Sequence, residues 1–162
     1  MMIRHGWLLL LLLMGCSSTV VLDRDVPSGF DLDGEWVVDA AASEVAPGTR
    51  RLRAQGIGIS LVAHDFPVLR CERMTIEQSA DSMGIEYDGA SYRDVSWGVR
   101  QRGLWEVNAG WEEGVFRILS KARDAKAEEM MTLADSGRRL IVQVVVESEG
   151  DTIDITRQFV RR

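Results

Sequence analysis

Apolar and polar residues alternate most regularly in the last quarter of the chain. Between residues 152 and 160, Ile153, Ile155 and Phe159 share one face of an extended chain, and the residues between them are mainly polar. A second run, residues 140–147, places its leucine and three of its valines on one face in the same way. A period of two is typical of a strand that buries one face and exposes the other.

Shorter segments of this kind, separated by turn residues such as Asp88-Gly89, run through the preceding part of the chain. The strands expected from these patterns cover residues 35–39, 57–63, 73–78, 85–88, 92–97, 104–108, 115–121, 128–134, 140–147 and 152–160. Short strands at this spacing, with no convincing amphipathic helix, predict an all-β antiparallel meander. We expect a barrel of about 8–10 strands, because closure removes exposed sheet edges. A two-sheet β-sandwich is the alternative.

The first fifteen residues have the features of a secretion signal peptide. Arg4 supplies a positive charge, and residues 7–14 are eight consecutive apolar residues. That run is too short to span a bilayer, which needs roughly 20 residues, but it fits the apolar region of a signal peptide.

The apolar run ends in Leu13-Met14-Gly15-Cys16. This segment resembles the bacterial lipobox, in which a small residue precedes an invariant cysteine. The resemblance implies cleavage between Gly15 and Cys16 and attachment of diacylglycerol to the Cys16 thiol, followed by acylation of the new amine, with palmitate as a typical chain. A thiol suits this reaction because it is nucleophilic near neutral pH. An ordinary secreted protein with a chance cysteine at this place is the alternative.

The lipoprotein resemblance also implies a location and a division of the chain. Aspartate after the lipidated cysteine tends to retain such proteins in the inner membrane, whereas Ser17 stands here; we therefore expect the outer membrane, with the domain facing the periplasm. Residues 16–30 have no periodicity and are expected to be a lipid-anchored tether, and residues 31–162 the antiparallel β domain. Cys71 then has no disulfide partner, and we expect it to be buried and unreactive.

The start of the β domain, from Phe30 to Trp36, resembles the opening of lipocalin-like, calycin-type proteins. In that family a Gly-x-Trp motif enters the first strand, and an arginine of the last strand packs across the tryptophan ring. Gly34 and Trp36 match the motif, and the resemblance gives Arg157 the second role. It implies that these three residues close the fold. The likeness extends most closely to small bacterial lipoproteins and secreted proteins of an uncharacterised family.

Charge and candidate chemistry narrow the functional classes. The net charge is −6, which argues against nucleic acid as a partner because phosphate binding needs clustered Lys and Arg. His64 is the one histidine outside the signal peptide, and with Cys71 as the one unlipidated cysteine a zinc site is not expected. No phosphate-binding or dinucleotide-binding glycine motif occurs. We therefore expect no catalytic residues, no metal, no cofactor and no enzymatic activity.

Aromatic residues offer the most suggestive candidate site. Trp97, Trp105 and Trp111 fall within fifteen residues and could line a pocket for an apolar ligand, or else simply fill a small barrel. The leading hypothesis is a lipid-anchored envelope protein that binds a small apolar ligand or an envelope partner without catalysing a reaction. The alternative is a structural or assembly protein of the outer membrane that has no ligand pocket.

Overall fold

The computed structural model describes residues 20–45 and 47–162. The expected signal peptide, residues 1–15, and the expected lipidation site Cys16 lie outside the described residues. In the part that is described, none of the helices has the length and apolar character needed to cross a membrane.

Ten strands form one antiparallel sheet in the described part of the chain. In chain order they are β1 (Gly34–Val38), β2 (Arg73–Gln78), β3 (Ser82–Tyr87), β4 (Arg93–Ser96), β5 (Gly98–Arg102), β6 (Trp105–Glu112), β7 (Val115–Lys121), β8 (Ala125–Ala134), β9 (Arg139–Ser148) and β10 (Asp151–Arg161). Their order across the sheet is β4-β3-β2-β1-β10-β9-β8-β7-β6-β5. The all-β antiparallel meander predicted from the alternation is confirmed, and the expected strands 73–78 and 115–121 match β2 and β7.

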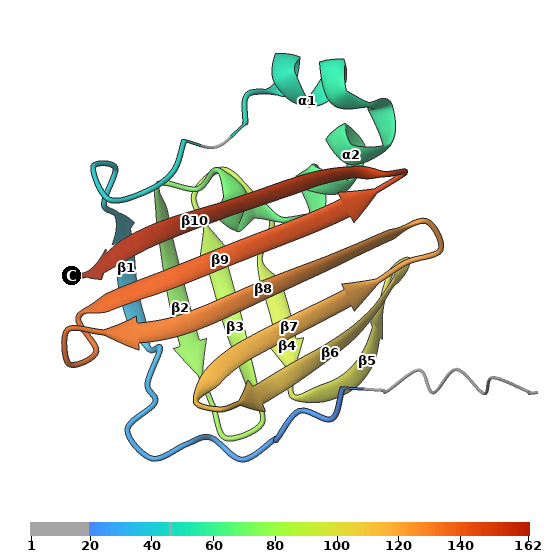
Figure 1. Cartoon of the computed structure of the whole chain (residues 1–162). Helices are drawn as coiled ribbons and strands as arrows, with labels where there is room; N and C mark the ends of the chain where they lie inside the picture. The colour runs from blue at the N-terminus through green and yellow to red at the C-terminus, as the bar shows by residue number, and fades with distance from the viewer. Residues whose placement is uncertain (1–19, 46) are drawn as a thin grey trace, which may run out of the picture.

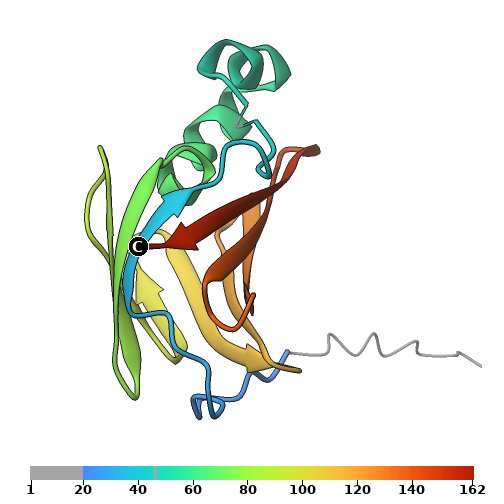
Figure 2. The ribbon, with the colours of Figure 1, turned by 90° about the vertical axis from the view of Figure 1, so that its left-hand side faces the viewer.

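The sheet curls into a nearly closed barrel, which Figures 1 and 2 show from two sides. β1 pairs with β2 on one side and with β10 on the other, so the first and last strands lie next to each other. The two ends of the sheet are β4 and β5, which follow each other in the sequence but are not neighbours in the sheet. We call the gap between β4 and β5 the seam. The fold is a barrel with one seam, and the sandwich alternative is excluded.

Two short helices and two 3₁₀ turns connect β1 to β2 and lie at one end of the barrel (Figure 1). They are α1 (Thr49–Gln55), α2 (Ile57–Val62), η1 (Ala63–Asp65) and η2 (Pro67–Leu69). Helices this short are not stable alone in water. They are held in place because Leu52, Ile59 and Ala63 are buried in the core of the barrel.

Two sequence-based expectations about these elements are wrong. The segment expected as a strand over residues 57–63 forms α2 and the start of η1. A short apolar run does not distinguish a strand from a helix by periodicity, and here Ile59 and Ala63 are buried at helical spacing while Leu61 is exposed. Conversely, β5 was not expected, because its sequence GVRQR has no apolar alternation.

Trp36, the middle residue of β1, is fully buried, and its indole N–H donates to the carbonyl of Leu32 at 2.8 Å. Its partner across the β1–β10 ladder is Arg161, whose guanidinium carbon lies 4.5 Å from the centre of the Trp36 ring. The contact that sequence assigned to Arg157 is therefore made by Arg161. Arg157 lies four residues, roughly 13 Å, further along the same face. Gly34 has a φ of +120° and lies against the Arg161 side chain.

The segment from Leu22 to Phe30, which the sequence places in a tether, lies against the barrel. Leu22 is buried, and Asp23 pairs with Trp111 through two backbone hydrogen bonds of 2.9 and 2.8 Å. The Phe30 ring packs edge-on against the Trp111 ring at 5.8 Å between centroids. The N-terminal segment thus belongs to the folded domain.

The close approach of this segment to β6 depends on Gly110. A Cβ atom there would meet the backbone oxygen of Asp23 at 2.3 Å and the Cβ of Leu22 at 2.8 Å. We therefore expect Gly110→Ala to displace the segment and to lower the free energy of unfolding by about 1–3 kcal/mol, the usual cost of an imposed clash. Chemical denaturation measures this.

Gly48→Ala is the matched control, because nothing lies within 4 Å of the added Cβ and the backbone φ of −64° suits alanine. It should change stability by no more than about 0.5 kcal/mol. Equal stability of the two variants would show that the segment does not pack as described.

Candidate functional site

The inward faces of the strands enclose one continuous cluster of buried side chains that runs from β1 to β10. Most of these side chains are apolar. The exceptions that carry charge are Arg93, Glu129 and Arg157, which are 1%, 0% and 6% exposed. Buried charge is costly unless it is paired, so these three residues are the natural starting point for a functional site.

Arg93 of β4 and Glu129 of β8 form an ion pair across the barrel interior. Arg93 Nη1 lies 2.8 Å from one carboxylate oxygen of Glu129 and 2.6 Å from the other. Both side chains face inward because their ladder partners, Ile85 and Val144, are fully buried. Burial opposes the charge of Arg93, but the negative charge of Glu129 and its hydrogen bond with the guanidinium outweigh it, and the pKa of Arg93 is raised. The pair is therefore ionised inside the barrel.

The polar atoms around this pair are incompletely satisfied. Tyr87, on the inward face of β3, is 3% exposed and lies beside Arg93, but neither its hydroxyl nor Arg93 Nε makes a hydrogen bond of good geometry with a described residue. Burial is the main reason that the pKa of Tyr87 is raised, so its hydroxyl stays protonated and can donate. Such groups are rare in native interiors and call for an explanation.

The structure brings together two of the three tryptophans predicted to line a pocket. The ring centroids of Trp97 and Trp111 are 4.9 Å apart, and both rings contact Phe116 at 5.0 and 4.9 Å. All three are buried. This aromatic cluster lies on the side of the barrel where Phe30 of the N-terminal segment packs. In this region the rings contact one another, so they act as packing.

Trp105 lies apart from that cluster. Its ring packs edge-on against Phe66 at 5.4 Å, and its indole N–H donates to an Asp65 carboxylate oxygen at 2.8 Å. Arg93 also contacts Phe66, with its guanidinium carbon 5.9 Å from the ring centre. Trp105 thus lies near the buried ion pair, at the helical end of the barrel.

Arg157 is tied to backbone carbonyls rather than to an acid. Its guanidinium donates to the carbonyl of Leu69 and, at 2.8 Å, to that of Cys71, and it lies 5.8 Å from the Phe159 ring. It fixes the segment that leads from η2 into β2. Cys71 itself is buried, as expected, and burial is the main cause that raises the pKa of its thiol to about 12. This thiol is protonated at neutral pH and therefore a poor nucleophile.

His64 is exposed in η1, and its Nδ1 lies 2.8 Å from the carbonyl of Ser60 one turn earlier. Among residues 20–45 and 47–162, no three His, Cys, Asp or Glu residues are grouped so that they could hold a metal ion. His64 therefore has a local contact within its own turn.

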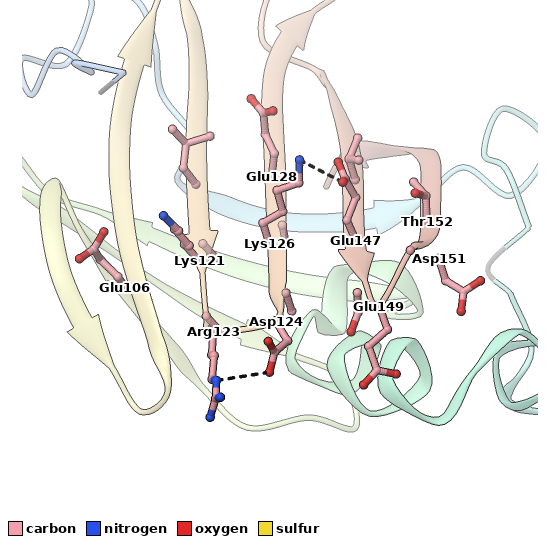
Figure 3. Close-up of a pocket in the computed structure, with 18 of the residues that line it drawn as sticks. Glu106, Lys121, Arg123, Asp124, Lys126, Glu128, Glu147, Glu149, Asp151 and Thr152 are labelled. Carbon is pink, nitrogen blue, oxygen red and sulfur yellow. Dashed lines mark ion pairs between the residues drawn. The ribbon is translucent and has the colours of Figure 1, made fainter. Parts of the chain in front are cut away.

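The described residues form a hollow on the outer face of the sheet. It is a groove of about 760 Å³ along β6 to β9 (Figure 3), and Val20 is among the residues that line it. Six acidic and three basic residues line it, and Lys126 pairs with Glu147 at 3.0 Å. Charged and apolar side chains share its walls, and it is open to solvent, so it does not enclose a ligand as most small-molecule pockets do.

Sequence reasoning did not find the ion pair. Glu128 and Glu129 are adjacent on one strand, so one of them had to face the interior, and that was the available signal for Glu129. Nothing in the sequence indicated Arg93, which is 36 residues away and in a strand of four residues.

No protein-family model matches the chain, and no curated protein matches it. Several solved structures, however, are similar to it in fold. The fluorescent protein UnaG superposes with a TM-score of 0.55 at 14% identity, covering 81% of this chain and 97% of that protein. Human cRBP IV gives 0.54 at 19% identity, covering 82% and 99%. The zebrafish ileal bile acid-binding protein, complexed with cholic acid, gives 0.52 at 12% identity, covering 80% and 98%. At these identities the likeness shows the fold alone, a lipocalin-like antiparallel β-barrel.

The ion pair generates a test of how the interior is held together. Glu129→Gln leaves the Arg93 charge buried without a counter-charge, and we expect it to cost about 3–5 kcal/mol of unfolding free energy. The double variant Arg93→Met with Glu129→Leu removes both charges and should be far more stable than Glu129→Gln. Urea denaturation compares the two. A small effect of Glu129→Gln would contradict the buried, ionised pair.

Proposed function

We propose that the protein is a lipid-anchored lipoprotein of the outer membrane, facing the periplasm, whose barrel binds a small apolar ligand without catalysing a reaction. The observation that carries the binding part is the charged group inside the barrel. Arg93, Glu129 and Tyr87 place polar atoms in a largely apolar interior, and two of those atoms, Arg93 Nε and the Tyr87 hydroxyl oxygen, make no hydrogen bond of good geometry with a described residue.

A buried ion pair would add little stability to a barrel that has only a structural role. Well-packed apolar residues in place of a buried ion pair are often neutral or stabilising. A ligand site, by contrast, needs a few convergent polar groups in apolar surroundings to orient what it binds. The Arg93–Glu129 pair beside Tyr87 has that composition.

Proteins with the same fold support this class of function. The zebrafish neighbour is a bile acid-binding protein whose structure contains cholic acid, and another neighbour, from Echinococcus granulosus, is a fatty-acid-binding protein (TM-score 0.51, 11% identity). The Arg93–Glu129 pair and Tyr87 face the barrel interior, so we place the ligand of this chain in the barrel and not in the outer groove.

The anchoring part of the proposal rests on the lipobox at residues 13–16. Cys16 is four residues before Val20, where the described structure begins, and four residues span at most roughly 14 Å. The folded domain already includes Leu22. Attached lipid would therefore hold the barrel itself against the bilayer surface, within reach of membrane-derived apolar molecules.

A structural or assembly role without a ligand is the second candidate. The observation in its favour is that side chains fill the interior, with the aromatic cluster of Trp97, Trp111 and Phe116 in mutual contact. A ligand would then have to displace side chains or open the barrel.

The anchor is tested by replacing the expected lipidated residue. Cys16→Ser should abolish labelling with radioactive palmitate and should stop cleavage at residue 15, because no thiol is left to acylate. Cys71→Ser is the matched control and should leave labelling unchanged. Palmitate on the Cys16→Ser protein would refute the lipobox assignment.

Ligand binding is tested by native mass spectrometry of the full lipoprotein extracted from membranes in mild detergent. We expect a non-covalent adduct that is lost on collisional activation. Val107→Trp, which adds bulk on the inward face of β6, should reduce the adduct several-fold.

Asn108→Trp on the outward face of the same strand is the control and should retain the adduct. Folding of each variant is checked by circular dichroism. A wild-type protein without any adduct would favour the structural role instead.

A further inference from the structure

The N-terminal segment of the domain crosses β6 on the outside of the barrel. Leu22 lies over Gly110 and is buried there. The carbonyl of Val20, two residues earlier, accepts a hydrogen bond from the Asn108 side chain at 3.2 Å. Gly110 and Asn108 share the outward face of β6, because Ala109 between them belongs to the buried core and alternate residues of a strand face opposite sides. Followed back from Leu22, the chain therefore runs along the outer face of β6 toward the start of that strand.

This course leads into the outer groove. Val20, Asn108 and Glu106 all line the groove, which continues over the outward faces of β7, β8 and β9 (Figure 3). Val20 is the first residue that the structure describes. Cys16 lies no more than roughly 14 Å from Val20, because four extended residues span no more than that. A lipid on Cys16 would therefore be attached to the domain on this face.

The opposite side of the barrel is too far away to share the anchor. Figures 1 and 2 show β2 and β3 on the side of the barrel away from β8. Packed β-sheets are about 10 Å apart, and the side chains on their outer faces add to this separation. An anchor of at most roughly 14 Å that starts over β6 does not reach around the barrel to the outward face of β3.

Charges of both signs line the groove and bear on which membrane surface it fits. Among the ion pairs of the described residues, Lys121, Glu106, Glu149 and Asp151 have no partner of opposite charge. A zwitterionic head group carries an ammonium and a phosphate, which acidic and basic side chains can each contact. Acids exceed bases in the groove, six against three, so a surface of anionic lipid would be repelled.

We propose that the outer face of β6–β9 is the membrane-facing side of the barrel, and that its groove lies against the head groups of a zwitterionic bilayer. The inference rests on the proposed lipid anchor at Cys16 and adds which face of the barrel that anchor turns to the membrane. The outward faces of β2 and β3 then point away from the bilayer.

Single-cysteine labelling tests this orientation. The chain offers no competing thiol, because Cys16 carries the lipid in this proposal and Cys71 is buried, which raises the pKa of its thiol to about 12. Glu106→Cys places a fluorophore in the groove, and Glu86→Cys places the same fluorophore on the outward face of β3. The two variants are matched, because both replace an exposed glutamate in a strand.

The labelled full lipoprotein is reconstituted into phosphatidylcholine vesicles that contain a lipid with a nitroxide on its head group. We expect the nitroxide to quench the fluorophore of Glu106→Cys several-fold more strongly than that of Glu86→Cys. Replacing part of the phosphatidylcholine with anionic phosphatidylglycerol at low salt should weaken the quenching of Glu106→Cys, because charge repulsion is least screened there. Unchanged or stronger quenching would overturn the preference for a zwitterionic surface.

A spacer shows whether the short anchor determines the orientation. A Gly/Ser insertion of about twelve residues between Thr19 and Val20 adds roughly 20 Å of flexible chain. The two fluorophores should then be quenched about equally, while the protein still floats with the vesicles in a density gradient. A difference that survives the spacer would show that the anchor does not set the orientation.

Flotation separates this inference from the anchor itself. Protein that floats with the vesicles but is quenched equally at both positions, or more strongly in Glu86→Cys, would overturn the orientation and leave the anchor standing. Protein that does not float with the vesicles would overturn the anchor and the inference together.

Discussion

The pairing of β1 with β10 is the interaction on which the rest of the structure depends. It joins strands β1–β4 to strands β5–β10, which share no other ladder among the described residues, so two separate meanders become one ten-stranded sheet that curls into a barrel with a defined inside. Side chains of each strand then alternate between the barrel interior, where they pack against one another, and the outer face, where they contact water. Trp36 and Arg161, which face each other across this ladder, reinforce the closure with an arginine stacked on a buried indole.

Because β1 pairs with β10, the gap in the barrel wall lies elsewhere, between β4 and β5. The sheet ends at β4 and β5, and these strands have only four and five residues. Where the ladder stops, inward positions no longer need to be apolar, and arginines occupy them. Arg100 and Arg102 of β5 are exposed there, whereas Arg93 of β4 is buried and is held in its ion pair with Glu129.

The sequence predicts the strands whose environment is uniform. β9 and β10 are paired on both sides and bury one face, so their alternation is clean and the expected bounds are within one residue of those observed. β5 could not be predicted because the seam exposes both of its faces, which removes the alternation. α2 was mistaken for a strand because Ile57 and Leu61 are exposed, and apolar residues on both sides of a short helix imitate a buried strand.

The site was harder to predict than the fold for a physical reason. Arg157 and Arg161 both lie on the inward face of β10, and only the register with β1 determines that Arg161 reaches Trp36. The Arg93–Glu129 pair likewise depends on two strands that lie on opposite sides of the barrel and have no ladder in common. Contacts across a closed barrel follow from curvature, which a strand's own alternation does not encode.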